Sequence, residues 1–238
     1  MKDNIFKKLD PEPSSFVFDE KLVPFFDDMV SRSVPCYKQL QQAILLLLKK
    51  YLKKGSSFYD LGASTGTTIS LALQMGLLDD VHIHALDASA AMIDQAKLNL
   101  SEFQDRITFH HHHLKEDFSY DATSVFLANL TFQFLNPRYR LKQLQSCYQA
   151  LLPGGALIYV EKLKVKSSDQ CFFDDLYRDF KYQQGYSYQE IFRKEKALMN
   201  VLQPLTLSEH QSLFKEAGFQ KTISFFQYFQ FWGMVGVK

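Results

Sequence analysis

The stretch Phe58-Tyr59-Asp60-Leu61-Gly62-Ala63-Ser64-Thr65-Gly66 constrains the fold more than any other part of the chain. It begins as an apolar strand, continues into a turn of small residues and then enters a helical pattern. Because the turn has little side-chain bulk, a ligand can lie against the backbone N–H groups at the helix start, where the helix dipole is positive. The sequence therefore predicts a strand, a ligand-binding turn and a helix in direct succession.

A carboxylate ends the next predicted strand, about twenty residues further on. This strand reads Ile83-His84-Ala85-Leu86-Asp87. A glycine-rich first turn followed by an acid after the second strand is typical of Rossmann-like sheets that hold a nucleoside. We expect the turn at Gly62 to receive the charged end of the ligand and Asp87 to accept hydrogen bonds from ribose hydroxyls.

Three interpretations of the turn compete. Residues 62–66 match G-x-S-x-G, the nucleophile elbow of hydrolases. They half-match the dinucleotide fingerprint G-x-G-x-x-G, which fails at Ser64, where the pyrophosphate needs a close approach to the backbone. They also match the shorter D-L-G-x-x-x-G turn of proteins that bind S-adenosylmethionine (SAM).

The hydrolase interpretation needs an acid and a histidine after later strands, and Asp121, Glu161 and His210 are candidates. It explains neither Asp87 nor Asp60, the acid just before the turn. The nucleoside interpretation explains both and is favoured.

Composition excludes several other classes of function. The chain has 238 residues, enough for one sizeable domain with a lid or an insertion. Its 27 Lys and Arg nearly cancel its 26 Asp and Glu, so we expect no direct binding of nucleic acid. Cys36, Cys147 and Cys171 form no C-x-x-C motif, which suits a reducing cytoplasm. The longest apolar run, Ala43 to Leu48, is too short to span a membrane.

Strand and helix patterns alternate from residue 55 onward, which predicts a parallel sheet with helices on both faces. Strands are expected near 57–61, 82–86, 107–112, 124–129 and 156–161, with helices over 67–75, 90–103 and 137–151, the last of them stopped by Pro153-Gly154-Gly155. A helical block at 169–201, a helix at 208–217 and an antiparallel hairpin at 222–237 complete the chain. This is the layout of class I methyltransferases, an α/β fold. We divide it into a helical arm or lid, residues 1–54, and a ligand-binding domain, residues 55–238, with an insertion at about 167–203.

Polar residues at the strand ends are the other candidates for function. Asn129 and Gln133 follow the fourth strand at the edge where ligands bind parallel sheets, or else they cap the loop there. The run His110 to His113 is more typical of solvated histidines at a strand end than of a metal site, because successive strand residues face opposite sides. We expect no metal. The alternating lysines of 162–166 are more typical of a solvated strand exit than of an RNA contact.

Taken together, short motifs along nearly the whole chain resemble carboxy-S-adenosyl-L-methionine (carboxy-SAM) synthases, SAM-binding enzymes of methyltransferase fold. The motifs, in order, are Phe18-Asp19-Glu20, Ser31-Arg32-Ser33-Val34-Pro35, Tyr37, Tyr59-Asp60-Leu61-Gly62, Ala91-Met92-Ile93, Asn129-Leu130-Thr131, Gln133-Phe134-Leu135, Pro153-Gly154-Gly155-Ala156-Leu157, Glu161-Lys162, Asp179-Phe180-Lys181, Gly185-Tyr186-Ser187, Glu190-Ile191, Asn200-Val201 and Ala217-Gly218-Phe219. The Ser-Val-Pro and Gly-Tyr-Ser blocks are specific to that family among methyltransferase folds.

The resemblance implies a reaction and partners. Prephenate would become phenylpyruvate while its lost carboxyl group is captured at the sulfonium methyl of SAM, which is acidic because the positive sulfur stabilises a neighbouring carbanion. The product, carboxy-SAM, would supply a second enzyme that modifies the wobble uridine of tRNA. Such a site must exclude water, and the arm and the insertion could form the lid. Aromatic residues in the C-terminal third, notably Phe172, Phe173, Leu176, Tyr177 and Phe180, lead us to expect a homodimer.

The family's ligand contacts carry over residue by residue. The cofactor-contacting tyrosine falls on Tyr37, and the turn falls on Gly62, Ala63 and Ser64, preceded by Asp60. The ribose acid is Asp87, and the Asn that usually follows it is Ala88 here. The acid that reads adenine falls near His113 or Leu114, and the asparagine after the fourth strand is Asn129. The bound ligand would be SAM, carboxy-SAM or S-adenosylhomocysteine; the resemblance leaves the catalytic residues unassigned.

The largest departure from the family lies at Glu195, where the arginine that pairs the carboxylate of carboxy-SAM is expected. This substitution reverses the charge. Arg193 lies about 200° away around a helix and does not simply substitute, while Lys194 and Lys196 lie about 100° away. Two hypotheses therefore stay open: carboxy-SAM synthesis with another cation, or an ordinary SAM-dependent methyltransferase. A hydrolase and a non-catalytic SAM-binding partner protein are more distant alternatives.

Overall fold

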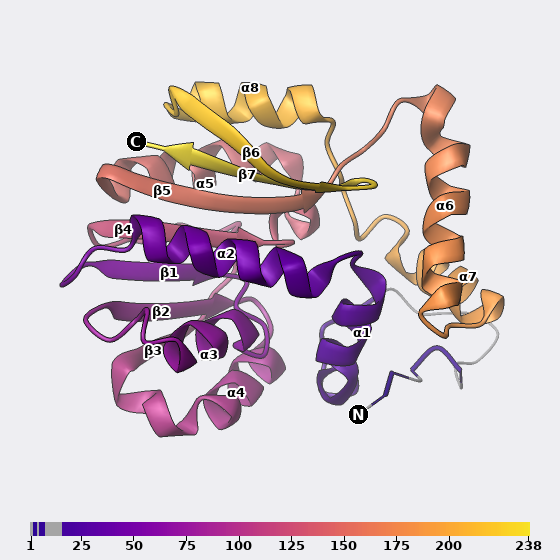
Figure 1. Cartoon of the computed structure of the whole chain (residues 1–238), viewed down its shortest axis with the longest axis horizontal. Helices are drawn as coiled ribbons and strands as arrows, with labels where there is room; N and C mark the ends of the chain where they lie inside the picture. The colour runs from indigo at the N-terminus through magenta and orange to yellow at the C-terminus, as the bar shows by residue number, and fades with distance from the viewer. Residues whose placement is uncertain (1, 4, 8–15) are drawn as a thin grey trace.

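The computed structural model describes residues 2–3, 5–7 and 16–238, and its core is a seven-stranded sheet of order β3-β2-β1-β4-β5-β7-β6 (Figure 1). The strands are β1 (Ser57–Leu61), β2 (His82–Asp87), β3 (Ile107–His111), β4 (Thr123–Asn129), β5 (Leu151–Lys162), β6 (Lys221–Tyr228) and β7 (Phe231–Val237). Strands β1 to β5 pair in parallel, whereas β7 is antiparallel to both β5 and β6. The predicted α/β class, parallel sheet and antiparallel terminal hairpin are confirmed.

Helices cover both faces of the sheet. They are α1 (Phe26–Ser33), α2 (Tyr37–Tyr51), α3 (Thr67–Gln74), α4 (Ala90–Asn99), α5 (Pro137–Ala150), α6 (Gln170–Gln183), α7 (Tyr188–Leu198) and α8 (Leu207–Ala217). Leu40, Ile44 and Leu48 of α2 pack with Ile69 and other residues of α3 on one side. Residues of α5 and α8 pack together on the opposite side, around Tyr59, Phe126 and Tyr159. Alternation along β1 therefore directs Phe58 and Asp60 toward α2, and Tyr59 and Leu61 toward α5.

Two boundaries differ from the expectation. Strand β5 begins at Leu151, so Pro153-Gly154-Gly155 lies inside the strand and does not separate helix from strand. A Cβ added at Gly155 would lie 2.8 Å from the carbonyl oxygen of Ser124, so only glycine fits against β4 at this point. Helix α4 ends at Asn99, and a 3₁₀ segment, Ser101–Arg106, follows it.

Helices α1, α6 and α7 lie beside the end of the sheet, where β5 leads into α6, and not over either face (Figure 1). The chain between α1 and α2 turns through Cys36, whose φ of +53° is the left-handed conformation. The predicted arm, residues 1–54, is described only in part, because residues 1, 4 and 8–15 fall outside the described ranges. Of the helices described, none is long and apolar enough to cross a bilayer.

Candidate nucleoside site

The turn after β1 folds over the end of β2. The backbone N–H groups of Gly62 and Ala63 both donate to the carbonyl oxygen of Leu86, each at 2.8 Å. Gly62 has a φ of +84°, and a Cβ added there would lie 2.5 Å from Thr131 Oγ1. Gly62 is therefore required both by its backbone conformation and by the close approach of the loop after β4.

Asp87 fixes this turn from the neighbouring strand. Its Oδ2 accepts a hydrogen bond from the N–H of Ser64 at 2.9 Å, and its Oδ1 accepts one from the N–H of Ser89 at 2.8 Å. Burial raises the pKa of Asp87, and these backbone hydrogen bonds oppose that rise. Each carboxylate oxygen keeps further acceptor capacity, so Asp87 can organise the turn and still accept from a diol.

Asp60 is a second carboxyl group beside Asp87. Its side chain is 3% exposed, and burial, followed by the charge of Asp87, raises its pKa to about 7. Tyr37, at the first turn of α2, lies close enough for the charge of Asp60 to act on it, and burial raises the pKa of Tyr37 to about 12. Its hydroxyl accepts a hydrogen bond from Gln41 Nε2 at 2.8 Å. The structure thus brings together four of the predicted positions: Tyr37, Asp60, Ser64 and Asp87.

Helix α1 reaches the same turn through a contact that the sequence analysis missed. Asp27 Oδ1 accepts hydrogen bonds from Thr65 Oγ1 at 2.7 Å and from Thr67 Oγ1 at 3.0 Å. Nothing in the sequence around Thr65 and Thr67 indicates that their hydroxyl groups bind an aspartate about forty residues earlier. The contact attaches the N-terminal region directly to the ligand turn.

Asn129 ends β4 beside the turn, and its Oδ1 is buried without a hydrogen-bond partner among the described residues. The following residue, Leu130, has a φ of +61°. Glu161, fully buried on β5, braces this loop by accepting the N–H of Phe132 at 2.8 Å, and burial raises the pKa of Glu161 to about 8. An unpartnered amide oxygen at the sheet edge is what a site that awaits a polar ligand would present.

The remaining positions lie along the end of β2 and β3. The carbonyl oxygen of Ala88 lies 3.1 Å from His111 Nε2, and the N–H of His112 donates to the carbonyl oxygen of Asp87 at 2.9 Å. His113 is exposed and Leu114 is buried. Of the two, His113 alone has a polar side chain, and Leu114 packs into the core on the α5 side of the sheet.

The histidine run is less solvated than expected. His110 is half-buried, and its Nε2 lies 3.2 Å from Nδ1 of His84 on the neighbouring strand. His112 packs against Phe118 with ring centroids 4.8 Å apart. Within the described ranges, no three or more His, Cys, Asp or Glu side chains are grouped to hold a metal ion.

The residues of a hydrolase triad do not meet. His210 is buried on α8, and its Nδ1 lies 3.4 Å from the hydroxyl of Tyr159 on the α5 side of the sheet. Asp121 interacts with Tyr59, and Glu161 holds Phe132. Ser64 therefore has no histidine base among the described residues.

Glu195 lies on α7 between two cations of α6, which the sequence analysis did not anticipate. Its Oε1 accepts from Lys181 Nζ at 3.0 Å, and its Oε2 accepts from Arg178 Nε at 3.2 Å. The charge of Glu195 is thereby neutralised within the chain. Arg193 points elsewhere and donates to the carbonyl oxygens of Phe6 and Lys7, while Lys194 Nζ donates to Ser33 Oγ at 2.7 Å.

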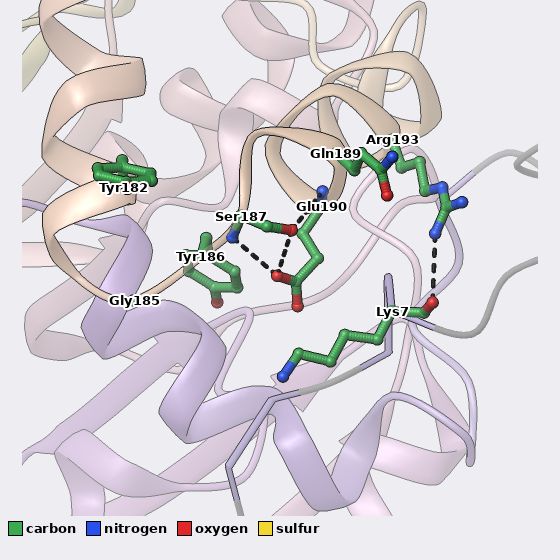
Figure 2. Close-up of a pocket in the computed structure, with 8 residues that line it drawn as sticks. All are labelled: Lys7, Tyr182, Gly185, Tyr186, Ser187, Gln189, Glu190 and Arg193. Atoms are coloured by element: carbon green, nitrogen blue, oxygen red, sulfur yellow. Dashed lines mark hydrogen bonds between the residues drawn. The ribbon is translucent and has the colours of Figure 1, made fainter.

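A cavity of about 510 Å³ lies apart from the turn, between the start of α7 and the N-terminal residues (Figure 2). Its lining consists of Lys7, Tyr182, Gly185, Tyr186, Ser187, Gln189, Glu190 and Arg193. Ser187 and Glu190 satisfy each other there in a helix capping box. None of the predicted ligand contacts borders this cavity.

The group at the turn fits an adenosyl sulfonium ligand. Two neighbouring carboxyl groups, Asp60 and Asp87, suit a cationic ligand that carries a ribose, and Asn129 offers an unpartnered amide oxygen.

A family model described as "Methyltransferase domain" matches residues 58–155. Solved structures agree on the fold. Human N-acetylserotonin methyltransferase in complex with SAM has a TM-score of 0.60 at 15% identity, over 92% of this chain and 55% of that one. A putative SAM-dependent methyltransferase from Methanococcus maripaludis has a TM-score of 0.59 at 17% identity, over 94% and 95% of the two chains.

Fold and site together define a SAM-dependent enzyme of the class I methyltransferase fold. The chain is 36% identical over 243 residues to carboxy-SAM synthase from Desulfotalea psychrophila, covering 100% of this chain and 97% of that protein. It is 38% identical over 240 residues to the same enzyme from Shewanella halifaxensis, covering 99% and 98%. The chain belongs to the carboxy-S-adenosyl-L-methionine synthase family.

Proposed function

We propose that this protein converts SAM and prephenate into carboxy-SAM, phenylpyruvate and water, and so supplies the carboxymethyl donor for tRNA wobble-uridine modification. The observation that carries the proposal is the set of Tyr37, Asp60, Gly62 and Asp87 at one turn, within a chain that matches the synthases over its full length. SAM, when bound, supplies the methyl group that becomes carboxylated.

The residues of the chain would bind and orient the ligand. Asp87 accepts hydrogen bonds from the ribose, and the turn at Gly62–Ser64 lies against the amino-acid end, with Asp60 balancing its positive charge. Asn129 offers its free Oδ1. Helix α1 is bound to the turn through Asp27. Together with helices α6 and α7 it would shield the site from water.

Incubation of the purified protein with SAM and prephenate, followed by mass spectrometry of the nucleosides, tests the proposal. We expect carboxy-SAM and an equal amount of phenylpyruvate. Omission of prephenate is the control and should leave SAM unchanged. Absence of carboxy-SAM from a protein that binds S-adenosylhomocysteine would contradict the proposal.

Glu195 supports a second candidate, an ordinary SAM-dependent methyltransferase, because it stands where the synthases are expected to carry an arginine. Under this alternative the enzyme would bind SAM and carboxy-SAM with similar affinity. Titration of both ligands into the wild-type protein separates the two candidates. A clear preference for carboxy-SAM would rule out the methyltransferase.

We also propose a cytoplasmic homodimer. Five large apolar side chains of the α6–α7 region are more than half exposed: Phe172, Tyr182, Tyr188, Phe192 and Met199. Two of the residues first considered, Tyr177 and Phe180, are instead used within the chain, against Phe231 and Phe229. A dimer mass by light scattering, lost in Phe192→Glu, is expected. A monomer at micromolar concentration would contradict it.

A further inference from the structure

Lys162 is the last residue of β5, at the sheet edge where β4 also ends. Val160, two residues earlier, packs in the cluster of Leu40 and Ile44, so alternation places Lys162 on the α2 side of the sheet. Tyr37 packs against the same cluster. The backbone N–H of Lys162 donates to Gln133 Oε1 at 3.0 Å, which ties it to the loop that begins at Asn129. Lys162 thus shares both the face and the edge of the sheet with the nucleoside site.

The ring of Tyr177 holds the Lys162 side chain in place. Lys162 Nζ lies 4.5 Å from the ring centroid. The ring is itself fixed, because the Tyr177 hydroxyl donates to the carbonyl oxygen of Ser33 at 2.7 Å. Lys181 Nζ lies 4.3 Å from the same centroid. An ammonium over an aromatic ring is oriented by cation–π attraction without any neutralisation of its charge.

The neighbouring cations already have partners, and Lys162 does not. Lys181 and Arg178 bind Glu195, and Arg178 also pairs with Asp175 at 3.3 Å. Asp174 and Glu195 act on Lys162 only at longer range: Asp174 accepts a hydrogen bond from Gln170 Nε2 at 2.8 Å, and Glu195 is held by Lys181 and Arg178. Among residues 2–3, 5–7 and 16–238, no hydrogen bond or ion pair reaches Lys162 Nζ. Burial, followed by the charge of Lys181, lowers the pKa of this ammonium to about 8. A half-buried, oriented ammonium is costly without an anionic partner, and the described part of this chain supplies none in direct contact.

We propose that Lys162 determines specificity by binding a carboxylate of the ligand. The inference rests on the proposed function. Lys162 would take the role of the arginine that the family is expected to carry at position 195. Glu195 neutralises Lys181 and Arg178, so their charges compete little for the incoming carboxylate. That carboxylate belongs either to the carboxymethyl group of carboxy-SAM or to prephenate, and both present the same chemistry to Nζ.

The test compares Lys162→Met with Lys164→Met in titrations of S-adenosylhomocysteine, carboxy-SAM and prephenate. Methionine keeps an unbranched side chain against Tyr177 but removes the charge. Lys164 is an exposed lysine two residues away and is the matched control. We expect Lys162→Met to weaken carboxy-SAM binding by roughly 10- to 100-fold, the effect of losing a hydrogen bond to a charged group, and to leave S-adenosylhomocysteine within about twofold. Lys162→Arg should recover part of the loss.

Loss confined to carboxy-SAM assigns the product carboxylate to Lys162, and loss confined to prephenate assigns the co-substrate. Either result supports the inference. Equal weakening of S-adenosylhomocysteine would overturn it, because the residue would then serve either the fold or the amino-acid carboxylate that S-adenosylhomocysteine and carboxy-SAM share. Unchanged binding of carboxy-SAM and of prephenate would also overturn the inference, while the proposed function would stand. A wild-type protein that binds no adenosyl ligand would instead reject the proposed function itself.

Discussion

Thr131 lies directly against Gly62, so that a Cβ atom at residue 62 would meet Thr131 Oγ1 at 2.5 Å and Cγ2 at 2.6 Å. The same hydroxyl donates to the carbonyl oxygen of Leu61 at 2.7 Å. The loop after β4 is therefore locked onto the turn after β1 at the point where the ligand is expected.

We expect Gly62→Ala to lower the free energy of unfolding by about 2–4 kcal/mol, from a left-handed backbone strain and from overpacking against Thr131. Gly55→Ala is the matched control: Gly55 has a φ of +71° but nothing within 4 Å of its added Cβ. It should lose only about 1–2 kcal/mol. Urea denaturation measures both. Thr131→Ala should relieve part of the defect of Gly62→Ala, and a coupling energy near zero would show that the contact is unimportant.

Asp87→Ala should weaken S-adenosylhomocysteine binding by roughly 10- to 100-fold, because the variant loses the ribose acceptor and the bond that fixes the N–H of Ser64. Asp94→Ala is the control, since Asp94 is an exposed acid on α4 paired with Lys97 at 3.1 Å. That substitution should change affinity by less than about twofold. Calorimetric titration measures the affinity of each protein for S-adenosylhomocysteine. Equal affinity in Asp87→Ala and wild type would show that Asp87 does not contact the ligand.

Asp60 predicts a pH dependence of stability. Its pKa is about 7 in the folded chain and 3.8 in the unfolded chain, so the folded state binds more protons between these values. The contribution of Asp60 to stability therefore falls as pH rises from about 4 to about 7 and is constant above that range. Asp60→Asn should be more stable than wild type at pH 8, and the difference should shrink toward pH 4. Denaturant titrations across this range measure it.

The same carboxyl group predicts proton release on binding. A cationic ligand favours the ionised form of Asp60, so SAM should bind more tightly as pH rises from 6 to 8, with release of a proton near neutral pH. Calorimetry in buffers of different ionisation enthalpy detects the proton. Asp60→Asn should release less. An unchanged proton count in that variant would assign the effect to another group.

The strand and helix order followed from the sequence because its periodicity and turn residues are local signals. Residues 57–61 alternate between two buried faces, and Ser89 caps α4 by accepting from Met92 N–H at 3.2 Å. The end of α5 at Ala150 was predicted to within one residue, but the start of β5 was not. Pro153-Gly154-Gly155 suggests a loop by composition, whereas here it lies in a strand that passes close to β4. The positions of Gly62, Asp60 and Asp87 were predictable from their spacing after strands. Their contacts were not, because Asp27, Thr131 and Tyr177 reach the site from segments far apart in the sequence.

The Glu195 side chain, 31% exposed, is bound by both Lys181 and Arg178. Lys181 is only 3% exposed, so loss of its partner leaves a buried charge unpaired, and arginine at position 195 adds a third cation beside it. We expect Glu195→Arg to lower the free energy of unfolding by about 2–5 kcal/mol, toward the lower end because Glu195 is partly solvated. Glu102→Gln, at an exposed acid, should have no measurable effect.

Reversal of the pair separates charge from shape. The double variant Arg178→Glu/Glu195→Arg should regain about half of the lost stability, because it restores an opposite charge between α6 and α7. Glu195→Arg alone should not gain affinity for carboxy-SAM, since the two α6 cations repel the new guanidinium and Lys162 keeps its own role. Differential scanning calorimetry and titration of carboxy-SAM measure the two effects. A Glu195→Arg protein as stable as wild type, with a tenfold gain in carboxy-SAM affinity, would show instead that residue 195 faces the ligand directly.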